Sequence, residues 1–307
     1  MEQDSVTMTL SKHSSKGSLL ILVAAVLWSS GGLFIKSVSL DGYGVSLWRS
    51  AFAALTLLIF YRRVVPREVR RASRWLSPQI FITAVVYAAL LVLFVLATKL
   101  TTSANAIFLQ FTAPIYVLFF EPILNKTKIK ASDIITVLIT IGAMVLFFLG
   151  KFDSNAVLGN ILALASGIFF AAYTLLLKHE KTGEAGMWQS VIVGHIIIVI
   201  VMTALTGIGI TSPVPYDLAD VGMLVFLGVM QIGVPYSLFT IGIHSVSALD
   251  ALLLCMLEPV LNPVWVFLGK NEIPGIWALT GGAIILAIVA TRAYLSYKKN
   301  TPVRTPS

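Results

Sequence analysis

Charged residues are scarce in this sequence. Asp, Glu, Lys and Arg make up 12% of the 307 residues, while hydrophobic residues make up 57%. Soluble domains carry roughly a quarter charged residues, so a soluble fold of this length could not hide so much apolar surface. A lipid bilayer removes this difficulty, because the outer faces of the helices can lie against hydrocarbon instead of water. The composition therefore predicts an integral membrane protein.

Cysteine and histidine are also nearly absent. The single cysteine, Cys255, excludes an internal disulfide and a thiolate cluster, and its apolar surroundings indicate a small buried side chain. There are four histidines, of which His13 lies in the N-terminal tail, and this argues against a histidine-rich metal site. We therefore expect no metal and no cofactor.

Motifs for catalysis and nucleotide hydrolysis are missing as well. The sequence contains no Gly-x-x-x-x-Gly-Lys-Ser/Thr loop and no Gly-x-Ser-x-Gly elbow. His179 and Glu180 begin a His-Glu-x-x-His zinc motif, but Gly183 stands where the second histidine is needed. We therefore expect a protein that is not an enzyme and has no catalytic residues. Any energy for its work would come from an ion or solute gradient.

What the sequence does contain is a series of ten long apolar runs. Each is close to the roughly 17–25 residues that a helix needs to cross the hydrocarbon core. The fold class that they predict is an all-α integral membrane protein with ten transmembrane helices. The runs are Ser18–Val38, Gly44–Tyr61, Leu76–Thr98, Ser103–Leu124, Ala131–Leu149, Ala156–Lys178, Met187–Thr206, Leu218–Phe239, Val246–Leu268 and Ile273–Ser296.

The basic residues predict an orientation. With ten spans, 17 of the 22 Lys and Arg residues fall on the side of the two termini. Because cytoplasmic loops are enriched in Lys and Arg, we expect both termini to be cytoplasmic in a multi-pass protein of the cytoplasmic (inner) membrane. The formal charge of +8 sits in short loops such as Arg62–Arg74. This arrangement favours contact with anionic headgroups and makes nucleic acid an unexpected partner.

The two halves of the chain resemble each other. A shift of 145 residues places Ala106 on Ala251 and Pro114 on Pro259, and a shift of 142 places Lys36 on Lys178. We expect tails over residues 1–17 and 297–307, and five-helix repeats over residues 18–150 and 156–296. Because five is odd, the second repeat must enter the membrane from the opposite side. Inverted repeats are a hallmark of transporters that bind their solute near the bilayer midplane.

At this point the chain resembles the drug/metabolite transporter superfamily, EamA type, over roughly residues 18–292. The pattern usual after the ninth span is a Gly-Glu pair, whereas Lys270 and Asn271 separate Gly269 from Glu272 here. The resemblance implies ten helices in two five-helix repeats, and export of amino acids and other metabolites or import of some nutrients. It is carried by Leu27-Trp28-Ser29-Ser30-Gly31-Gly32, Trp48-Arg49, Pro114, Leu257-Glu258-Pro259-Val260, Leu268-Gly269 and Glu272.

Glu258 is the main candidate for function, because an ionised carboxylate is costly in the middle of a span. Helical spacing places Asp250, Glu258, Asn262 and Trp265 on one face, as in a cavity lining. Glu258 and Asp250 are the candidate partners for a substrate amine or a coupling proton. The structural alternative is a protonated Glu258 that is hydrogen-bonded to a neighbouring helix.

Other polar and aromatic residues could line the same cavity. Glu121 lies near the cytoplasmic boundary, where snorkelling or a loop partner is the simpler reading, and interfacial anchoring is the simpler reading for Lys36 and Arg49. His195 is more simply a packing residue. The remaining predicted substrate-binding residues are Gln110, Trp28, Ser29, Tyr87, Gln231 and Tyr236.

We therefore predict a secondary transporter of small organic metabolites, working by alternating access in the lipid bilayer. It would export amino acids or related amphipathic molecules, with a proton as the possible coupling ion. Two alternatives remain: a channel or non-transporting membrane scaffold, and an intramembrane enzyme. The sequence carries no signal of oligomeric state.

Overall fold

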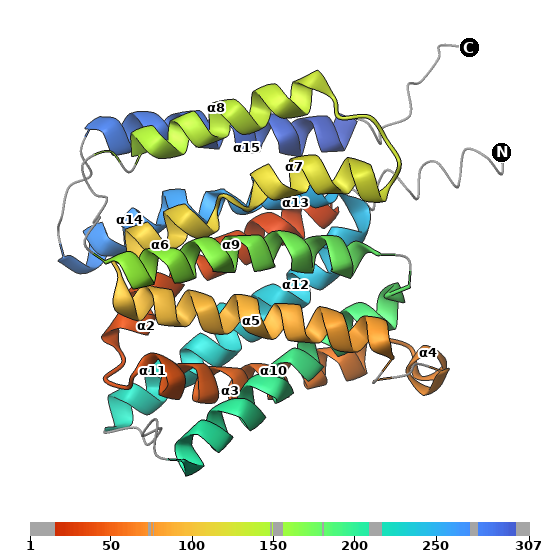
Figure 1. Ribbon diagram of the computed structural model, residues 1–307, viewed down its shortest axis with the longest axis vertical. Coiled ribbons are helices and arrows are strands. Elements are labelled where there is room, and N and C mark those ends of the chain that lie inside the picture. The colour runs from red at the N-terminus through yellow and green to blue at the C-terminus, as the bar shows by residue number, and fades with distance from the viewer. Residues whose placement is uncertain are drawn as a thin grey trace.

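The structure is a computed structural model that describes residues 16–72, 75, 77–147, 149, 156–179, 181–208, 217–270 and 276–298. In these ranges every regular element is a helix (Figure 1). A first helix covers residues 16–28. It is followed by α2 (Gly31–Ser37), α3 (Gly42–Val64), α4 (Arg67–Ala72), α5 (Pro78–Leu100), α6 (Ser103–Gln110), α7 (Ala113–Leu124), α8 (Ala131–Phe147), α9 (Val157–Lys178), α10 (Gly183–Gly207), α11 (Leu218–Gly228), η1 (Val229–Gly233), α12 (Val234–Gly242), η2 (Ile243–Ser245), α13 (Ala248–Cys255), α14 (Leu257–Lys270) and α15 (Ile276–Lys298).

These helices form ten spans. Eight helical segments in the described ranges are long and apolar enough to cross a membrane. The fifth span is the shorter apolar helix α8, and the ninth is the pair α13 and α14. The predicted ten-helix membrane fold is confirmed. The largest boundary difference is in the eighth span, whose helical segment runs to Ser245, six residues past the predicted Phe239.

The packing reflects the inverted repeat. The second span packs on the seventh (α3 on α10), and the fifth lies beside the tenth (α8 and α15; Figure 1). The fourth span packs on the sixth (α6 and α7 on α9), and its counterpart, the ninth, packs on the first (α14 on α2). Spans of one repeat therefore pack against spans of the other, as expected when two oppositely inserted units form one bundle.

Spans four and nine are broken at equivalent places. Span four is interrupted at Phe111 and Thr112, and span nine at Met256, which is 145 residues after Phe111. Each break comes just before a proline, Pro114 or Pro259. A proline inside a helix has no N–H to donate, and its ring clashes with the carbonyl four residues earlier. The two prolines therefore explain why each of these spans consists of two shorter helices.

The two ends of the bundle carry equivalent contacts. The ammonium group of Lys36, at the end of span one, donates to the carbonyl of Thr101 at 2.7 Å. Lys178, at the end of span six, donates to the carbonyls of Ile243 and Val246. Val246 stands 145 residues after Thr101, and Lys178 stands 142 after Lys36. The same lysine contact thus closes the loop after span three and the loop after span eight.

We call the end that contains Gly17, Ser245 and Arg292 the tail end, because the first and last described residues lie there (Figure 1). Thr101 lies at the opposite end.

Span eight contains a π-helical turn. The segment η1 (Val229–Gly233) forms i→i+5 hydrogen bonds between α11 and α12. Such turns insert one extra residue into a helix and are frequent at functional sites. Gln231 lies inside this turn and is buried. The turn therefore places a polar side chain in the interior of the bundle.

Gly167 allows span six to approach the break in span four. A Cβ atom at Gly167 would lie 2.6 Å from the carbonyl oxygen of Gln110 and 3.1 Å from that of Leu109. Ala163 and Ala171, one turn to either side, are fully or almost fully buried. Ala163, Gly167 and Ala171 therefore form a packing surface, as small residues at helix interfaces usually do.

We predict that Gly167→Ala destabilises the protein. Its Cβ would meet backbone atoms that cannot move alone, and overpacking of this kind costs about 1–3 kcal/mol. The matched control is Gly142→Ala, where a Cβ would meet nothing within 4 Å. Thermal unfolding in detergent should show a lower melting temperature for Gly167→Ala and an unchanged or higher one for Gly142→Ala, since alanine favours helix. Equal melting temperatures for the two variants would contradict this packing.

Candidate functional site

A small cavity lies in the interior of the bundle, among side chains of seven spans from both repeats. It reaches the middle of α5 at Leu90 and Leu91, halfway along span three. Its volume of about 30 Å³ is enough for about two water molecules. The lining residues are Trp28, Arg49, Leu90, Leu91, Phe94, Gln110, Phe170, Gln231, Ile232, Tyr236 and Glu258.

Glu258 provides the carboxylate of this cavity. It stands in the first turn of α14, directly after the break at Met256, and is 6% exposed. Among the described residues its carboxylate has no hydrogen-bond or ion-pair partner. The structural alternative, a carboxylic acid bonded to a neighbouring helix, therefore finds no support in this part of the chain. A buried carboxylate without a partner is costly, which marks Glu258 as a functional candidate.

Arg49 provides the positive charge, and the expectation that it anchors span two at the interface is wrong. It is 1% exposed and lines the same cavity as Glu258. Because α3 begins at Gly42, Arg49 lies about 10 Å inside the helix at 1.5 Å per residue. That depth is too great for an interfacial anchor. The signal for this role was present in the sequence, because an arginine two turns into a span has few other reasons to be there.

The cavity holds donors without partners. Nη1 of Arg49 lies 3.4 Å from Oε1 of Gln231, the outer limit of a hydrogen bond, and Nε of Arg49 has no partner within the described ranges. The indole Nε1 of Trp28 is likewise buried and unpaired there. The side chain of Gln110 is 7% exposed, in the last turn of α6 beside the break in span four. These groups can bind a polar solute without first giving up a protein partner.

Aromatic rings form one wall of the cavity. The rings of Trp28 and Tyr236 lie 4.8 Å apart between centroids. Tyr87 packs edge-on against Tyr236, also at 4.8 Å between ring centroids, and its hydroxyl is 2.9 Å from Nε2 of His195. Tyr87 is therefore a support behind the wall and does not line the cavity. His195 is fully buried and packs edge-on against Tyr87.

Three predicted site residues form a junction beside the cavity instead of lining it. Span one is interrupted at Ser29 and Ser30. The Asn262 amide donates to the carbonyl of Ser29 at 3.0 Å, and the Trp265 indole donates to its hydroxyl at 2.7 Å. These bonds from span nine satisfy polar groups at the break, which would otherwise be exposed to apolar surroundings.

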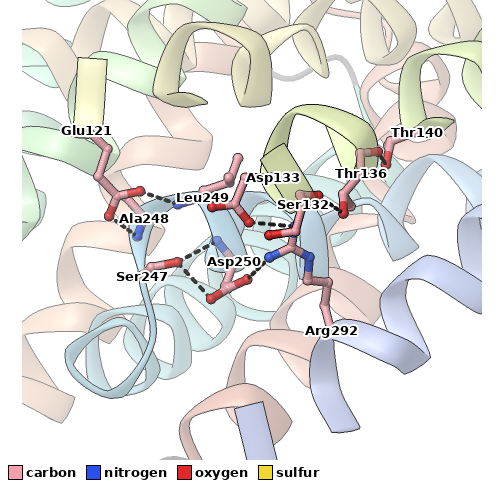
Figure 2. Close-up of polar contacts among 10 residues, drawn as sticks. All are labelled: Glu121, Ser132, Asp133, Thr136, Thr140, Ser247, Ala248, Leu249, Asp250 and Arg292. Atoms are coloured by element: carbon pink, nitrogen blue, oxygen red, sulfur yellow. Dashed lines mark hydrogen bonds and ion pairs between the residues drawn. The ribbon is translucent and has the colours of Figure 1, made fainter. Parts of the chain in front are cut away.

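Asp250 does not reach the cavity. It lies at the start of α13, where its backbone N–H and carboxylate bond to Ser247 and its carboxylate pairs with Arg292 at 3.1 Å (Figure 2). The break at Met256 interrupts the helix between Asp250 and Glu258, so the predicted continuous stripe does not exist. Asp250 is therefore removed from the candidate site.

Glu121 has the loop partner that the sequence suggested. Its two carboxylate oxygens accept the backbone N–H groups of Ala248 at 2.9 Å and Leu249 at 3.0 Å (Figure 2). A carboxylate at a helix N-terminus satisfies free N–H groups and opposes the positive end of the helix dipole. This contact joins the end of span four to the start of span nine.

The two halves of this chain match the same protein family. The EamA-like transporter family model matches residues 15–149 and again residues 157–291. This chain belongs to the EamA-like transporter family. The predicted resemblance to the drug/metabolite transporter superfamily is thus confirmed. As an EamA-like transporter, the protein acts on a small-molecule solute in a lipid bilayer.

Relatives of known name agree with this assignment. An Archaeoglobus fulgidus protein named "Uncharacterized transporter" is 25% identical over 89% of this chain and 96% of its own length. Human "Solute carrier family 35 member G1" is 23% identical over 88% of this chain and 77% of its own length. A crystal structure with a TM-score of 0.75 covers 92% of this chain and 99% of its own, at 16% identity. That likeness supports the fold alone.

The sequence therefore located five of the eleven residues that line the cavity. Trp28, Gln110, Gln231, Tyr236 and Glu258 were predicted and line it together. Ser29, Asn262 and Trp265 lie at the adjoining junction, Tyr87 lies behind the wall, and Asp250 lies at the tail end.

We predict that the junction of spans one and nine behaves as one coupled unit. Trp265→Phe and Ser29→Ala each remove the 2.7 Å hydrogen bond, so each should lower stability by about 1 kcal/mol. The double variant should lose little more than either single one. The control is Ser37→Ala, because the Ser37 hydroxyl is exposed and bonds only to Leu33 of its own helix. Melting temperatures in detergent test this, and additive losses would contradict the coupling.

Proposed function

We propose that this protein is a secondary transporter of small zwitterionic metabolites, amino acids first, and that it works by alternating access. The observation that carries this proposal is that one carboxylate, Glu258, and one guanidinium, Arg49, both line the same cavity in the interior of the bundle.

The two charges match the two ends of a zwitterion. An α-amino acid carries a carboxylate, which the planar fork of Arg49 can bind through two hydrogen bonds. It also carries an ammonium group, which can donate hydrogen bonds to the Glu258 carboxylate. The two acidic candidates from the sequence, Glu258 and Asp250, favour amines, zwitterions or cations. With Asp250 removed and Arg49 added, the wall charges balance and favour a solute with both charges.

The remaining lining supports an amphipathic solute. Gln110 and Gln231 offer amide donors and acceptors, while Trp28, Tyr236 and Phe94 offer apolar ring surface. A cavity with mostly apolar walls and a few placed polar groups is typical of small-molecule sites.

The small volume supports alternating access. A cavity with room for about two waters must widen before it can hold an amino acid. The equivalent contacts at the two ends, Lys36 on Thr101 and Lys178 on Val246, give each end its own closure. Two equivalent closures around one central cavity are what opening to either side requires.

Direction and location follow from the sequence and the family resemblance. We propose that the protein exports its solute, because the resemblance to the EamA type implies export of amino acids and other metabolites. We place it in the cytoplasmic membrane with the tail end inward, because the basic residues gather on the side of the termini. Counterflow in liposomes of known orientation tests the direction, and accessibility of a tag on the Arg62–Arg74 segment tests the topology.

We predict that the two charges recognise separate parts of the solute. In a thermal-shift screen, the purified protein should be stabilised by an amino acid more than by its decarboxylated amine or its deaminated acid. One charge-assisted hydrogen bond contributes about 1.5–3 kcal/mol, so each analogue should bind roughly 10- to 150-fold more weakly. Glu258→Gln should lose the preference over the acid, and Arg49→Gln the preference over the amine.

Exposed residues provide the controls for this experiment. Glu184→Gln and Arg63→Gln remove the same charges at exposed positions and should leave the preferences unchanged. If sugars or nucleosides stabilise the protein and amino acids do not, or if both cavity variants lose both preferences equally, the zwitterion proposal is wrong.

We also propose that Glu258 carries the coupling proton when no ammonium group occupies it. Glu258→Gln cannot exchange a proton, so accumulation driven by a pH gradient across liposomes should disappear, while solute counterflow should persist at solute concentrations high enough to saturate the variant. A Glu258→Gln protein that accumulates solute like the native protein at every pH would remove this role.

A further inference from the structure

A second cavity lies at the tail end, away from the central one. Its volume is about 880 Å³, and no residue lines both cavities. It is bounded by the end of α7 and the start of α8 from the first repeat, and by the start of α13 and the end of α15 from the second. Figure 2 shows the polar contacts along its wall. The transport cycle proposed above makes no use of this cavity.

The lining of this cavity changes from polar to apolar with depth. Thr127, Lys128 and Lys130 form the rim, in the connection between α7 and α8. Ile139 and Ile284 line it farther along α8 and α15. Ile139 lies eight residues into α8, or about 12 Å at 1.5 Å per residue. Half of a hydrocarbon core is about 15 Å thick, so the cavity reaches across most of one leaflet.

The acidic groups of this wall are already engaged. Arg292 donates to Asp133 at 2.9 Å and to Asp250 at 3.1 Å, and Glu121 accepts two backbone N–H groups of α13 (Figure 2). By contrast, the side-chain ammonium groups of Lys128 and Lys130 form no hydrogen bond or ion pair with any residue that the structure describes. The charge that remains available at the rim is therefore positive.

We propose that this cavity binds an anionic glycerophospholipid. The lipid phosphate would lie between Lys128 and Lys130, and the acyl chains would fill the apolar depth between the α8–α15 pair and the ends of α7 and α13. The amphipathic gradient and the free positive rim match such a lipid, because basic pockets between transmembrane helices bind anionic headgroups. A free phosphate ion would use the rim and leave the apolar depth unfilled. The bound lipid would touch both repeats.

The test is lipid binding by the purified full-length protein in detergent. Phosphatidylglycerol should raise the melting temperature more than phosphatidylcholine does, and inorganic phosphate should have no effect. Lys128→Gln/Lys130→Gln should weaken phosphatidylglycerol binding by about 30-fold, as expected for two lysines near an anionic headgroup. Lys126→Gln is the matched control, because Lys126 is exposed on the same connection but does not line the cavity.

A second variant tests the apolar depth. Ala287 lines the cavity and is exposed, so Ala287→Phe should fill the cavity without disturbing the packed core. It should weaken phosphatidylglycerol binding and leave the melting temperature without lipid unchanged. The proposal fails if Lys126→Gln weakens binding as much as the double variant, if inorganic phosphate stabilises the protein as phosphatidylglycerol does, or if Ala287→Phe binds lipid normally. None of these readouts depends on the transported solute.

Discussion

Backbone hydrogen bonding within lipid is the constraint on which this structure depends. In hydrocarbon, each unpaired N–H or C=O costs several kcal/mol, so a span can be interrupted only where other protein groups satisfy it. The breaks in spans one and four obey this rule. The Asn262 amide donates to the carbonyl of Ser29 at the first break, and the N–H and hydroxyl of Thr112 donate to the carbonyl of Leu109 at the second. Because the breaks must be buried, they lie in the centre of the bundle, where the cavity is.

The prolines break two spans beside the cavity and so place polar side chains at its walls. Pro114 and Pro259 lie at equivalent positions of the two repeats and each ends a helical ladder a few residues earlier. Gln110 therefore stands at the end of one half-helix and Glu258 at the start of another, and both face the cavity. In many transporters, half-helices of this kind provide the substrate and ion sites at the midplane. Here the pattern of two prolines 145 residues apart was legible in the sequence.

The parts of the structure that follow from local rules could be predicted. The lengths of the apolar runs predicted the ten spans, and the position of Glu258 within such a run marked it as a candidate for function. The parts that depend on which way a side chain points in the folded bundle could not be predicted. Helical spacing placed Asp250 on the face of Glu258, but the spacing rule assumes an unbroken helix, and the turn at Met256 invalidates it. Arg49 was misread because its distance from the membrane surface depends on where α3 begins. Tyr87 shows the same limit, since an aromatic ring near a cavity can as easily support the wall as form it.

The π-helical turn of span eight determines which side chains of that span face the cavity. Each residue of an α-helix advances the chain by about 100°, so the extra residue in η1 offsets α12 from α11 by that angle. Gln231 inside the turn and Tyr236 beyond it reach the same cavity only with this offset in place. A chain shortened by one residue at Val229–Gly233 could keep its length, hydropathy and ends almost unchanged and still turn the ring of Tyr236 away from Trp28. The angular phase of a single span is thus as much a determinant of this cavity as the identity of any residue that lines it.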